Sequence, residues 1–135
     1  MNVPEENKKI VIRFNKEFLE EGSIQSYHNL VAKDFINRTA PPEFSSFDGM
    51  LKFMEVYRKA FTDIKIEIFE QIAERDLVTT RKVIKATHAG EFMGMQPSGK
   101  RVDIPVIDIV RVVNGKYVEH WGIRDMQQVM KGKKD

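Results

Sequence analysis

The first third of the chain has hydrophobic residues at the three- and four-residue spacing of amphipathic helices. Residues 2–22 are predicted to form one helix, which ends at Gly22 and whose hydrophobic stripe comprises Ile10, Val11, Phe14 and Phe18. Asn2 and Glu5 have the spacing of a capping box at its start. The same periodicity predicts a second helix over 23–35 and a third over 48–61. The proline-containing segment 37–46 is expected to be the loop between them.

After Asp63 the hydrophobic period changes from about 3.6 to 2, which is typical of strands. Strands are predicted over 64–73, 77–90, 101–113 and 116–124, followed by one or two helical turns over 125–130. Asn114-Gly115 is the strongest hairpin signal, because both residues tolerate the positive φ angles of a type I′ turn. Helices followed by hairpin-linked strands predict an α+β fold, with three helices covering one face of an antiparallel sheet.

The chain of 135 residues has the size of one domain, predicted over 1–130 with a frayed basic tail over 131–135. It contains no cysteine, which excludes disulfides and thiolate chemistry and fits a reducing compartment. Neither a signal peptide nor a membrane span is evident, so we expect a cytoplasmic protein. The net charge of +2 lies mostly in the tail, and nothing indicates a nucleic-acid surface.

Two motifs fail on inspection. The segment 94–101, GMQPSGKR, nearly matches a phosphate-binding loop, but Arg101 replaces the magnesium-binding hydroxyl and a strand follows instead of a helix. The three histidines, His28, His88 and His120, are far apart and no metal-binding spacing occurs. The sequence therefore predicts neither a nucleotide site nor a metal site.

A larger pattern resembles the SnoaL-like polyketide cyclases, also called ester cyclases. The family carries a T-H-x-G-x-F-x-G-x-x-P-T-G-K stretch, an Asn-Gly-Lys hairpin and a W-x-x-x-D segment. The matching residues are Thr87, His88, Gly90, Phe92, Gly94, Pro97, Gly99, Lys100, Asn114, Gly115, Lys116, Trp121 and Asp125. The resemblance covers almost the whole chain. Two departures concern the substrate: Arg38 stands where members often have histidine, and the usual C-terminal Gln-Leu-Gly is absent.

The resemblance implies a nuclear-transport-factor-2-like cone, in which helices close a curved sheet around a hydrophobic cavity. It also implies a cofactor-free aldol-type cyclisation of a small hydrophobic carbonyl compound, with Asp125 as the acid/base group. A carbon acid between carbonyls needs only one positioned carboxylate, and burial would raise the pKa of that group. The residues themselves leave an alternative open, because Asp125 followed by Gln128 also has the spacing of a helix cap.

The remaining candidates follow from strand alternation. His88 is expected to face the cavity, as a lining residue or a second catalytic group. If the last strand is regular, Trp121 shares a face with Tyr117 and Asp125, and His120 points away without a role. Substrate-binding residues are predicted to be Trp121, Phe92, Tyr57, Arg38 and Phe18.

Three functions remain open at this stage. The first is a cyclase or a related acid/base enzyme such as an isomerase or epoxide hydrolase. The second is a binding protein for a small hydrophobic ligand, and the third is a scaffold with a vestigial pocket. A homodimer through the outer sheet face is expected in each case, because residues 102–113 are hydrophobic on both sides.

Overall fold

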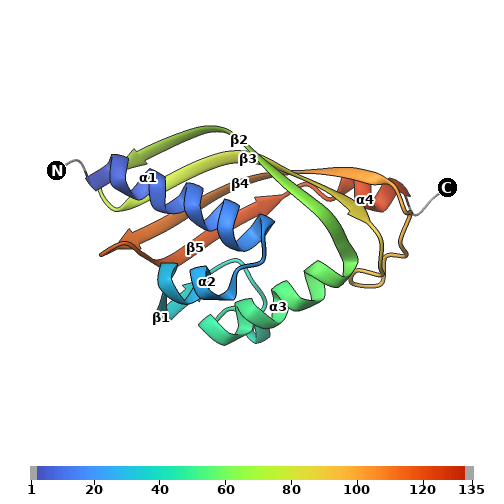
Figure 1. Cartoon of the computed structure of the whole chain (residues 1–135), viewed down its shortest axis with the longest axis horizontal. Coiled ribbons are helices and arrows are strands. Elements are labelled where there is room, and N and C mark those ends of the chain that lie inside the picture. The colour runs from blue at the N-terminus through green and yellow to red at the C-terminus, as the bar shows by residue number, and fades with distance from the viewer. Residues whose placement is uncertain (1–2, 133–135) are drawn as a thin grey trace.

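The computed structural model describes the backbone of residues 3–132 and shows an α+β fold. Helices α1 (Val3–Arg13) and α3 (Phe47–Ala60) lie across one face of a strongly bent sheet, and the two ends of the chain lie at opposite ends of the molecule (Figure 1). The predicted capping box involves Asn2, and the predicted tail includes 133–135; these positions lie outside the described residues.

The first predicted helix is present at the expected position, but its second half is a π-helix. After α1 the chain continues as a π-helix, η1 (Phe14–Glu20), and Gly22 ends it with a positive φ of 77°. Val11, Phe14 and Phe18 of the predicted stripe are buried against the sheet. A π-turn carries one extra residue, which shifts the face that the following side chains present.

The second predicted helix is wrong over its second half. Helix α2 (Ile24–Leu30) begins at the Ser23 cap and ends where the Val31 N–H bonds to the Tyr27 carbonyl. The chain then extends as β1 (Val31–Asn37), which pairs in parallel with β5. Hydrophobic spacing over so short a segment fits both elements, and only the partner strand decides between them. The sheet is consequently mixed rather than purely antiparallel.

Within the described residues the sheet has five strands in the order β1-β5-β4-β3-β2. The other four, predicted from the alternation, are β2 (Phe61–Glu74), β3 (Leu77–His88), β4 (Arg101–Val113) and β5 (Lys116–Arg124). The hairpin between β4 and β5 has positive φ at both Asn114 and Gly115, as its sequence predicted. A short 3-10 turn, η2 (Pro42–Phe44), lies in the loop before α3.

Strand β5 contains a β-bulge. Val112 of β4 pairs with Tyr117, but the preceding Arg111 pairs with Glu119, so Val118 is an extra residue. An extra residue reverses the alternation beyond it. After the bulge His120 therefore pairs with the buried Val110 on the inner face, and Trp121 pairs with Ile109 on the outer face.

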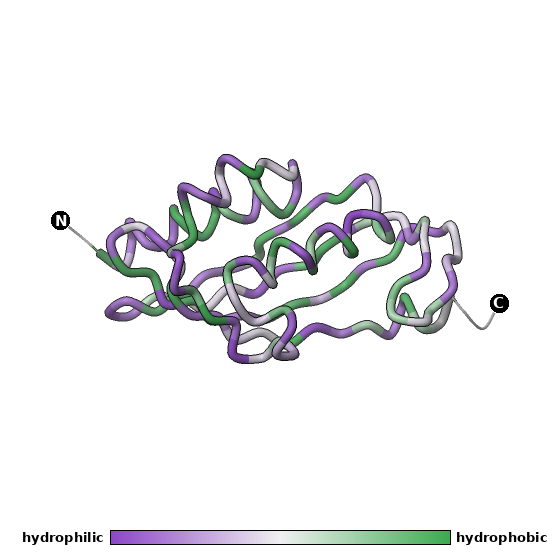
Figure 2. Tube along the Cα trace, turned by 90° about the horizontal axis from the view of Figure 1, so that it is seen from below, coloured by the Kyte–Doolittle hydropathy of each residue, from purple (hydrophilic) through white to green (hydrophobic). Residues whose placement is uncertain are grey.

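The hydrophobic core fills the concave side between helices and sheet. Hydrophobic and hydrophilic residues alternate along the elements instead of gathering in one long segment (Figure 2). No helix in the described part of the chain is both long and hydrophobic enough to span a bilayer.

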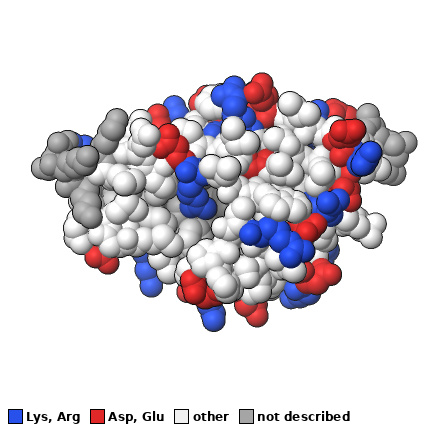
Figure 3. Space-filling view, turned by 180° about the vertical axis from the view of Figure 1, so that it is seen from behind, with Lys and Arg blue, Asp and Glu red and all other residues white. Residues whose placement is uncertain are grey.

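The outer face of the sheet is partly hydrophobic, with Ile107 and Ile109 exposed by 53% and 37%. Viewed from behind, the molecule shows acidic and basic side chains interspersed, with no cluster of one sign, and broad uncharged areas between them (Figure 3). The homodimer expected through this face stays a prediction.

The last predicted element is present as α4 (Gln127–Gly132), which reaches two residues into the stretch predicted as a tail. Its Val129 is fully buried in the core, whereas the neighbouring Met130 is 55% exposed. The Gln128 side chain also accepts a hydrogen bond from the Asp103 N–H of β4 at 2.7 Å. Helix α4 is thus held against β4 by both a hydrophobic and a polar contact.

We expect Val129→Ala to lower the free energy of unfolding by about 2 kcal/mol, because a fully buried valine side chain contributes about that much. Met130→Ala is the matched control and should change the value by less than about 0.5 kcal/mol. Urea unfolding monitored by circular dichroism measures both. Equal effects of the two substitutions would show that α4 is not docked on the sheet.

Candidate functional site

A cavity of about 440 Å³ lies between the helices and the concave face of the sheet. Its volume is in the range of small-molecule sites. Most of the wall is hydrophobic and includes Phe14, Phe53, Met54, Ile84, Phe92 and Val106. Polar side chains interrupt this wall at Asn37, Thr39, Tyr57, Lys82, Asp108, His120 and Arg124.

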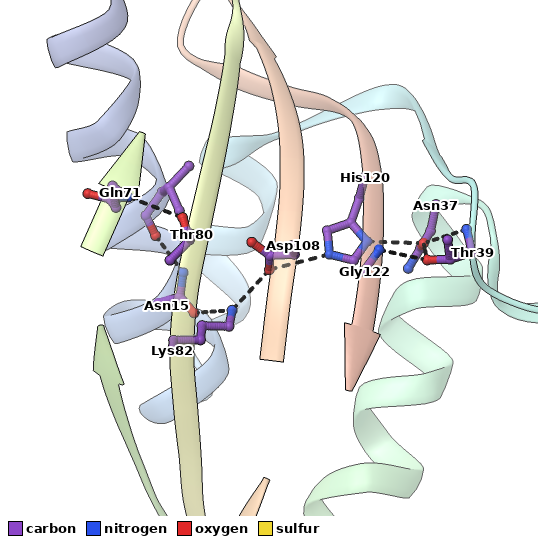
Figure 4. A network of polar contacts seen from close by, with 10 residues as sticks. Asn15, Asn37, Thr39, Gln71, Thr80, Lys82, Asp108, His120 and Gly122 are labelled. Carbon is purple, nitrogen blue, oxygen red and sulfur yellow. Dashed lines mark hydrogen bonds and ion pairs between the residues drawn. The ribbon is translucent and has the colours of Figure 1, made fainter. Parts of the chain in front are cut away.

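Four of the polar residues form one chain of contacts across the sheet (Figure 4). Lys82 Nζ of β3 lies 3.1 Å from Asp108 Oδ2 of β4. The same oxygen lies 3.5 Å from His120 Nε2 of β5. His120 Nδ1 lies 3.0 Å from Asn37 Oδ1 at the end of β1. The chain therefore links four neighbouring strands.

Lys82 and Asp108 are both buried, with side chains exposed by 3% and 7%. A buried ammonium needs several acceptors, and Lys82 Nζ also donates to Asn15 Oδ1 at 2.6 Å. Asn15 lies in η1, and its amide is held in turn by the Val11 carbonyl at 2.9 Å. The π-turn thus supplies the second partner of Lys82.

The two ring nitrogens of His120 face two different polar side chains. Asn37 Oδ1 also accepts the Thr39 backbone N–H at 3.2 Å, which fixes the amide with its oxygen towards His120. His120 Nδ1 must then donate to that oxygen. On the other side Nε2 faces the Asp108 carboxylate, which also only accepts when ionised. His120 therefore lies between two acceptor groups, the Asn37 amide oxygen and the Asp108 carboxylate.

The surroundings of Asp108 keep it ionised. Burial alone would raise its pKa, but Lys82 and His120 outweigh burial and hold the pKa of this carboxyl below its usual value. Both contacts fall on Oδ2, and the buried Oδ1 has no hydrogen-bond partner among the described residues. The result is a buried carboxylate in which one oxygen has two partners and the other has no hydrogen-bond partner among the described residues.

Tyr57 of α3 provides a second unpaired polar atom in the cavity wall. Its hydroxyl is buried and has no partner among the described residues. Burial raises the pKa of Tyr57 to about 12, so the phenol keeps its proton at neutral pH. Its ring lies 5.8 Å from that of Phe92, which lines the same wall. A neutral donor of this kind suits a carbonyl oxygen that gains negative charge.

Asp125 lies outside the cavity. It is exposed, its Oδ1 accepts the Gln127 N–H at 2.9 Å, and its own N–H bonds to the Pro105 carbonyl. Its neighbours Arg124 and Met126 line the cavity instead. Of the two readings, the geometry favours the helix cap at the start of α4.

His88 is fully buried but does not line the cavity. It stacks on Phe61 at 5.0 Å between ring centroids, and neither ring nitrogen has a hydrogen-bond partner among the described residues. Burial lowers the pKa of His88, with a smaller opposing effect from the Gly90 backbone, so it is a neutral core residue. The predicted inward orientation is correct, but the cavity does not extend to it.

The predicted binding residues divide into two groups. Phe92 and Tyr57 line the cavity, whereas Trp121, Arg38 and Phe18 do not. The bulge places Trp121 on the outer face, so the prediction that it shares a face with Tyr117 is wrong. Arg38 is paired with Glu119 at 2.9 Å, and Phe18 is buried in the core.

The prediction that His120 points away is wrong for the same reason, since β5 is not a regular strand. Lys82 and Asp108 had a signal in the sequence, because both occupy the buried parity of otherwise hydrophobic strands. A charged residue at a buried position needs a partner of opposite charge. Two such residues of opposite sign on adjacent strands are therefore expected to pair with each other.

Within residues 3–132, no group of three or more histidine, aspartate or glutamate side chains could hold a metal ion.

Comparison with known proteins identifies a family and related folds. The family model for SnoaL-like polyketide cyclases matches residues 9–132. AclR from Streptomyces galilaeus, a candidate hydroxylase, is 31% identical over 95% of each chain, with a TM-score of 0.82. IdmH from Streptomyces antibioticus, a candidate polyketide cyclase, is 25% identical over 93% of this chain and 96% of its own, with a TM-score of 0.81.

A SnoaL-like polyketide cyclase candidate from Jannaschia sp. CCS1 shares the fold, with a TM-score of 0.85 at 19% identity over 98% of this chain and 94% of its own. A search of curated proteins finds no match. The nuclear-transport-factor-2-like fold expected from the sequence is thereby confirmed.

We expect Lys82→Met to lower the free energy of unfolding at pH 7 by about 3–5 kcal/mol, because it leaves the buried Asp108 without its cation. The double variant Lys82→Met with Asp108→Leu removes both charges and should be more stable than the single variant. Urea unfolding of the three proteins gives the comparison. A single variant as stable as the wild type would show that the pair is not buried.

The pH dependence of the free energy of unfolding tests the same ion pair, Lys82 and Asp108. A folded pKa below the unfolded value of about 3.9 stabilises the protein above that pH, and the contribution is lost as the pH falls through the folded value. The wild type should therefore lose stability below about pH 4 more steeply than the double variant. Parallel curves would contradict the lowered pKa of Asp108.

Proposed function

We propose, since this chain belongs to the SnoaL-like polyketide cyclase family, that it catalyses an acid/base reaction of a small carbonyl compound inside its cavity. The reaction is an aldol-type cyclisation that needs no cofactor. The single observation that carries the proposal is Asp108, an ionised carboxylate in a mostly hydrophobic cavity lining, whose buried Oδ1 has no hydrogen-bond partner among the described residues.

Asp108 is the base of the proposed reaction. Its Oδ1 takes a proton from the carbon next to a carbonyl group, and the electron pair of the broken C–H bond moves to the carbonyl oxygen. The lowered pKa of Asp108 makes it a weak base, but it also ensures that the ionised form is present at neutral pH. Carbon flanked by two carbonyls is acidic enough for such a base.

Tyr57 stabilises the enolate that forms. Its protonated hydroxyl donates a hydrogen bond to the oxygen that becomes negative. An aspartate base combined with a neutral tyrosine donor is a known arrangement for proton abstraction beside a carbonyl. The enolate carbon then attacks a second carbonyl of the same molecule, and the new alkoxide takes the proton back from Asp108. No net proton is gained or lost.

Lys82 and His120 have a positioning role. They occupy Oδ2 of Asp108, so that the carboxylate is fixed and only Oδ1 is available. Asn37 Oδ1 contacts the imidazole from the other side, and the Thr39 hydroxyl donates to that same oxygen. A base that is fixed before the substrate binds avoids the cost of reorienting during the reaction.

Proton abstraction can be measured with 2-tetralone, a bicyclic ketone, as the exchange of its α-protons in D₂O by proton NMR. We expect Asp108→Asn to reduce the catalysed exchange at least a hundredfold, since asparagine cannot accept the proton. Asp125→Asn is the matched control and should leave exchange and stability unchanged, because asparagine caps a helix as well as aspartate.

Because Asp108→Asn leaves Lys82 unpaired, the rate is expressed per folded molecule, and the variant Asp108→Asn with Lys82→Met is measured beside it. Both should lack catalysed exchange. Activity retained by folded Asp108→Asn but lost by Asp125→Asn would replace Asp108 with Asp125 as the base. Tight binding of the ketone by the wild type, with no catalysed exchange, would instead indicate a binding protein.

Tyr57→Phe keeps the ring and its packing but removes the donor. We expect the rate of exchange to fall about 10²-fold or more, as for other single donors to a developing oxyanion. The stability should not decrease, because the hydroxyl has no partner to lose. An unchanged exchange rate in NMR would show that Tyr57 does not contact the reacting oxygen.

A further inference from the structure

Arg124, the last residue of β5, is a cation in the cavity wall that the proposed reaction does not use. It is exposed and lines the cavity, which places it at the mouth. Its guanidinium lies over the ring of Phe53, 5.4 Å from the centroid. Among the residues that the structure describes, no carboxylate pairs with Arg124, whereas Arg38 and Arg111 both pair with Glu119.

The guanidinium and the Tyr57 phenol both have Phe53 as a neighbour. Phe53 and Tyr57 are neighbours on α3, with ring centroids 6.0 Å apart. Arg124 also acts on the Tyr57 phenol, opposing the effect of burial on its pKa. The mouth of the cavity therefore presents one planar cation and, deeper, one buried hydroxyl without a partner.

The charges of the lining are unbalanced. Lys82 and Arg124 are positive, and Asp108 is the one acidic side chain in the described lining. Asp108 is already compensated by Lys82 and His120, so the charge of Arg124 is left over.

We propose that the ligand is a cyclic keto acid, an apolar ring system that carries keto groups and one carboxylate, and that Arg124 binds the carboxylate at the mouth. The guanidinium over the Phe53 ring has its N–H groups in the fork that matches a carboxylate. This inference rests on the proposed function, which gives the position of the reacting carbonyl. It adds that the ligand carries a negative charge.

The arrangement also orients the ligand. The carboxylate is attracted to Arg124 and avoids the hydrophobic interior, where it would lose its hydration. The ring system then extends inward along Phe53 and Phe92, and the carbonyl comes to the Tyr57 hydroxyl. In this orientation the carbon beside the carbonyl is directed to Asp108, which lies between Lys82 and His120.

The charge preference can be tested by calorimetry with two probes of nearly equal shape, naphthalene-2-carboxylate and naphthalene-2-carboxamide, at pH 7 and low salt. We expect the wild type to bind the carboxylate at least tenfold more tightly than the amide. Arg124→Gln should reduce the difference to about twofold or less. Arg124→Lys should retain part of it, because it keeps the charge but not the fork.

Lys116→Gln is the control for net charge, since Lys116 is exposed in the hairpin and does not line the cavity. It should keep the full preference. Equal binding of the two probes by the wild type, an unchanged preference in Arg124→Gln, or no binding of either probe would each overturn the inference.

Binding needs no turnover, so the two proposals fail separately. If the two probes bind equally and the exchange depends on Asp108, the keto-acid inference is wrong and the acid/base function is supported. If carboxylate binding depends on Arg124 but no exchange is catalysed, the anion site is supported and the proposed reaction is wrong.

Discussion

The ion pair between Lys82 and Asp108 is the constraint on which the site depends. Two opposite charges lie in a wall that is otherwise hydrophobic, where an isolated charge would be very costly. They are tolerated because each has further partners, Asn15 for the ammonium and His120 for the carboxylate. The register of β3, β4 and β5 and the winding of η1 are therefore coupled through one group of side chains.

The bulge in β5 determines what the cavity can do. If Val118 were paired in a regular ladder, the alternation would turn Trp121 inward and His120 outward. The polar chain would then stop at Asp108, and a large indole would occupy space that the cavity now leaves open. The parallel pairing of β1 with β5 has a related effect, because it brings Asn37 beside His120. These two irregular features fix the orientation of the imidazole between two acceptors.

The polar groups of the cavity lie on different elements of its wall. Arg124 is exposed at the end of β5, the Tyr57 hydroxyl is buried on α3, and the carboxylate of Asp108 lies on the sheet beside Lys82 and His120. Hydrophobic residues occupy the space between them and exclude water, which strengthens each polar interaction. A rigid, mostly apolar ligand with polar groups at separate positions is complementary to such a wall.

By itself, the amino-acid sequence determined the α+β class, the positions of α1, α3 and four strands, and the family, because these follow from local periodicity, turn residues and spaced motifs. It also carried a signal for Lys82 and Asp108 in the parity of their strands. Only the tertiary structure decided that residues 31–37 form a strand, because a short hydrophobic segment becomes helix or strand according to its partner. Only the bulge decided between His120 and Trp121, since one inserted residue reverses a period of two. The position of Asp125 was decided by packing as well: its motif is local, but whether its carboxylate reaches the cavity depends on how α4 docks on β4.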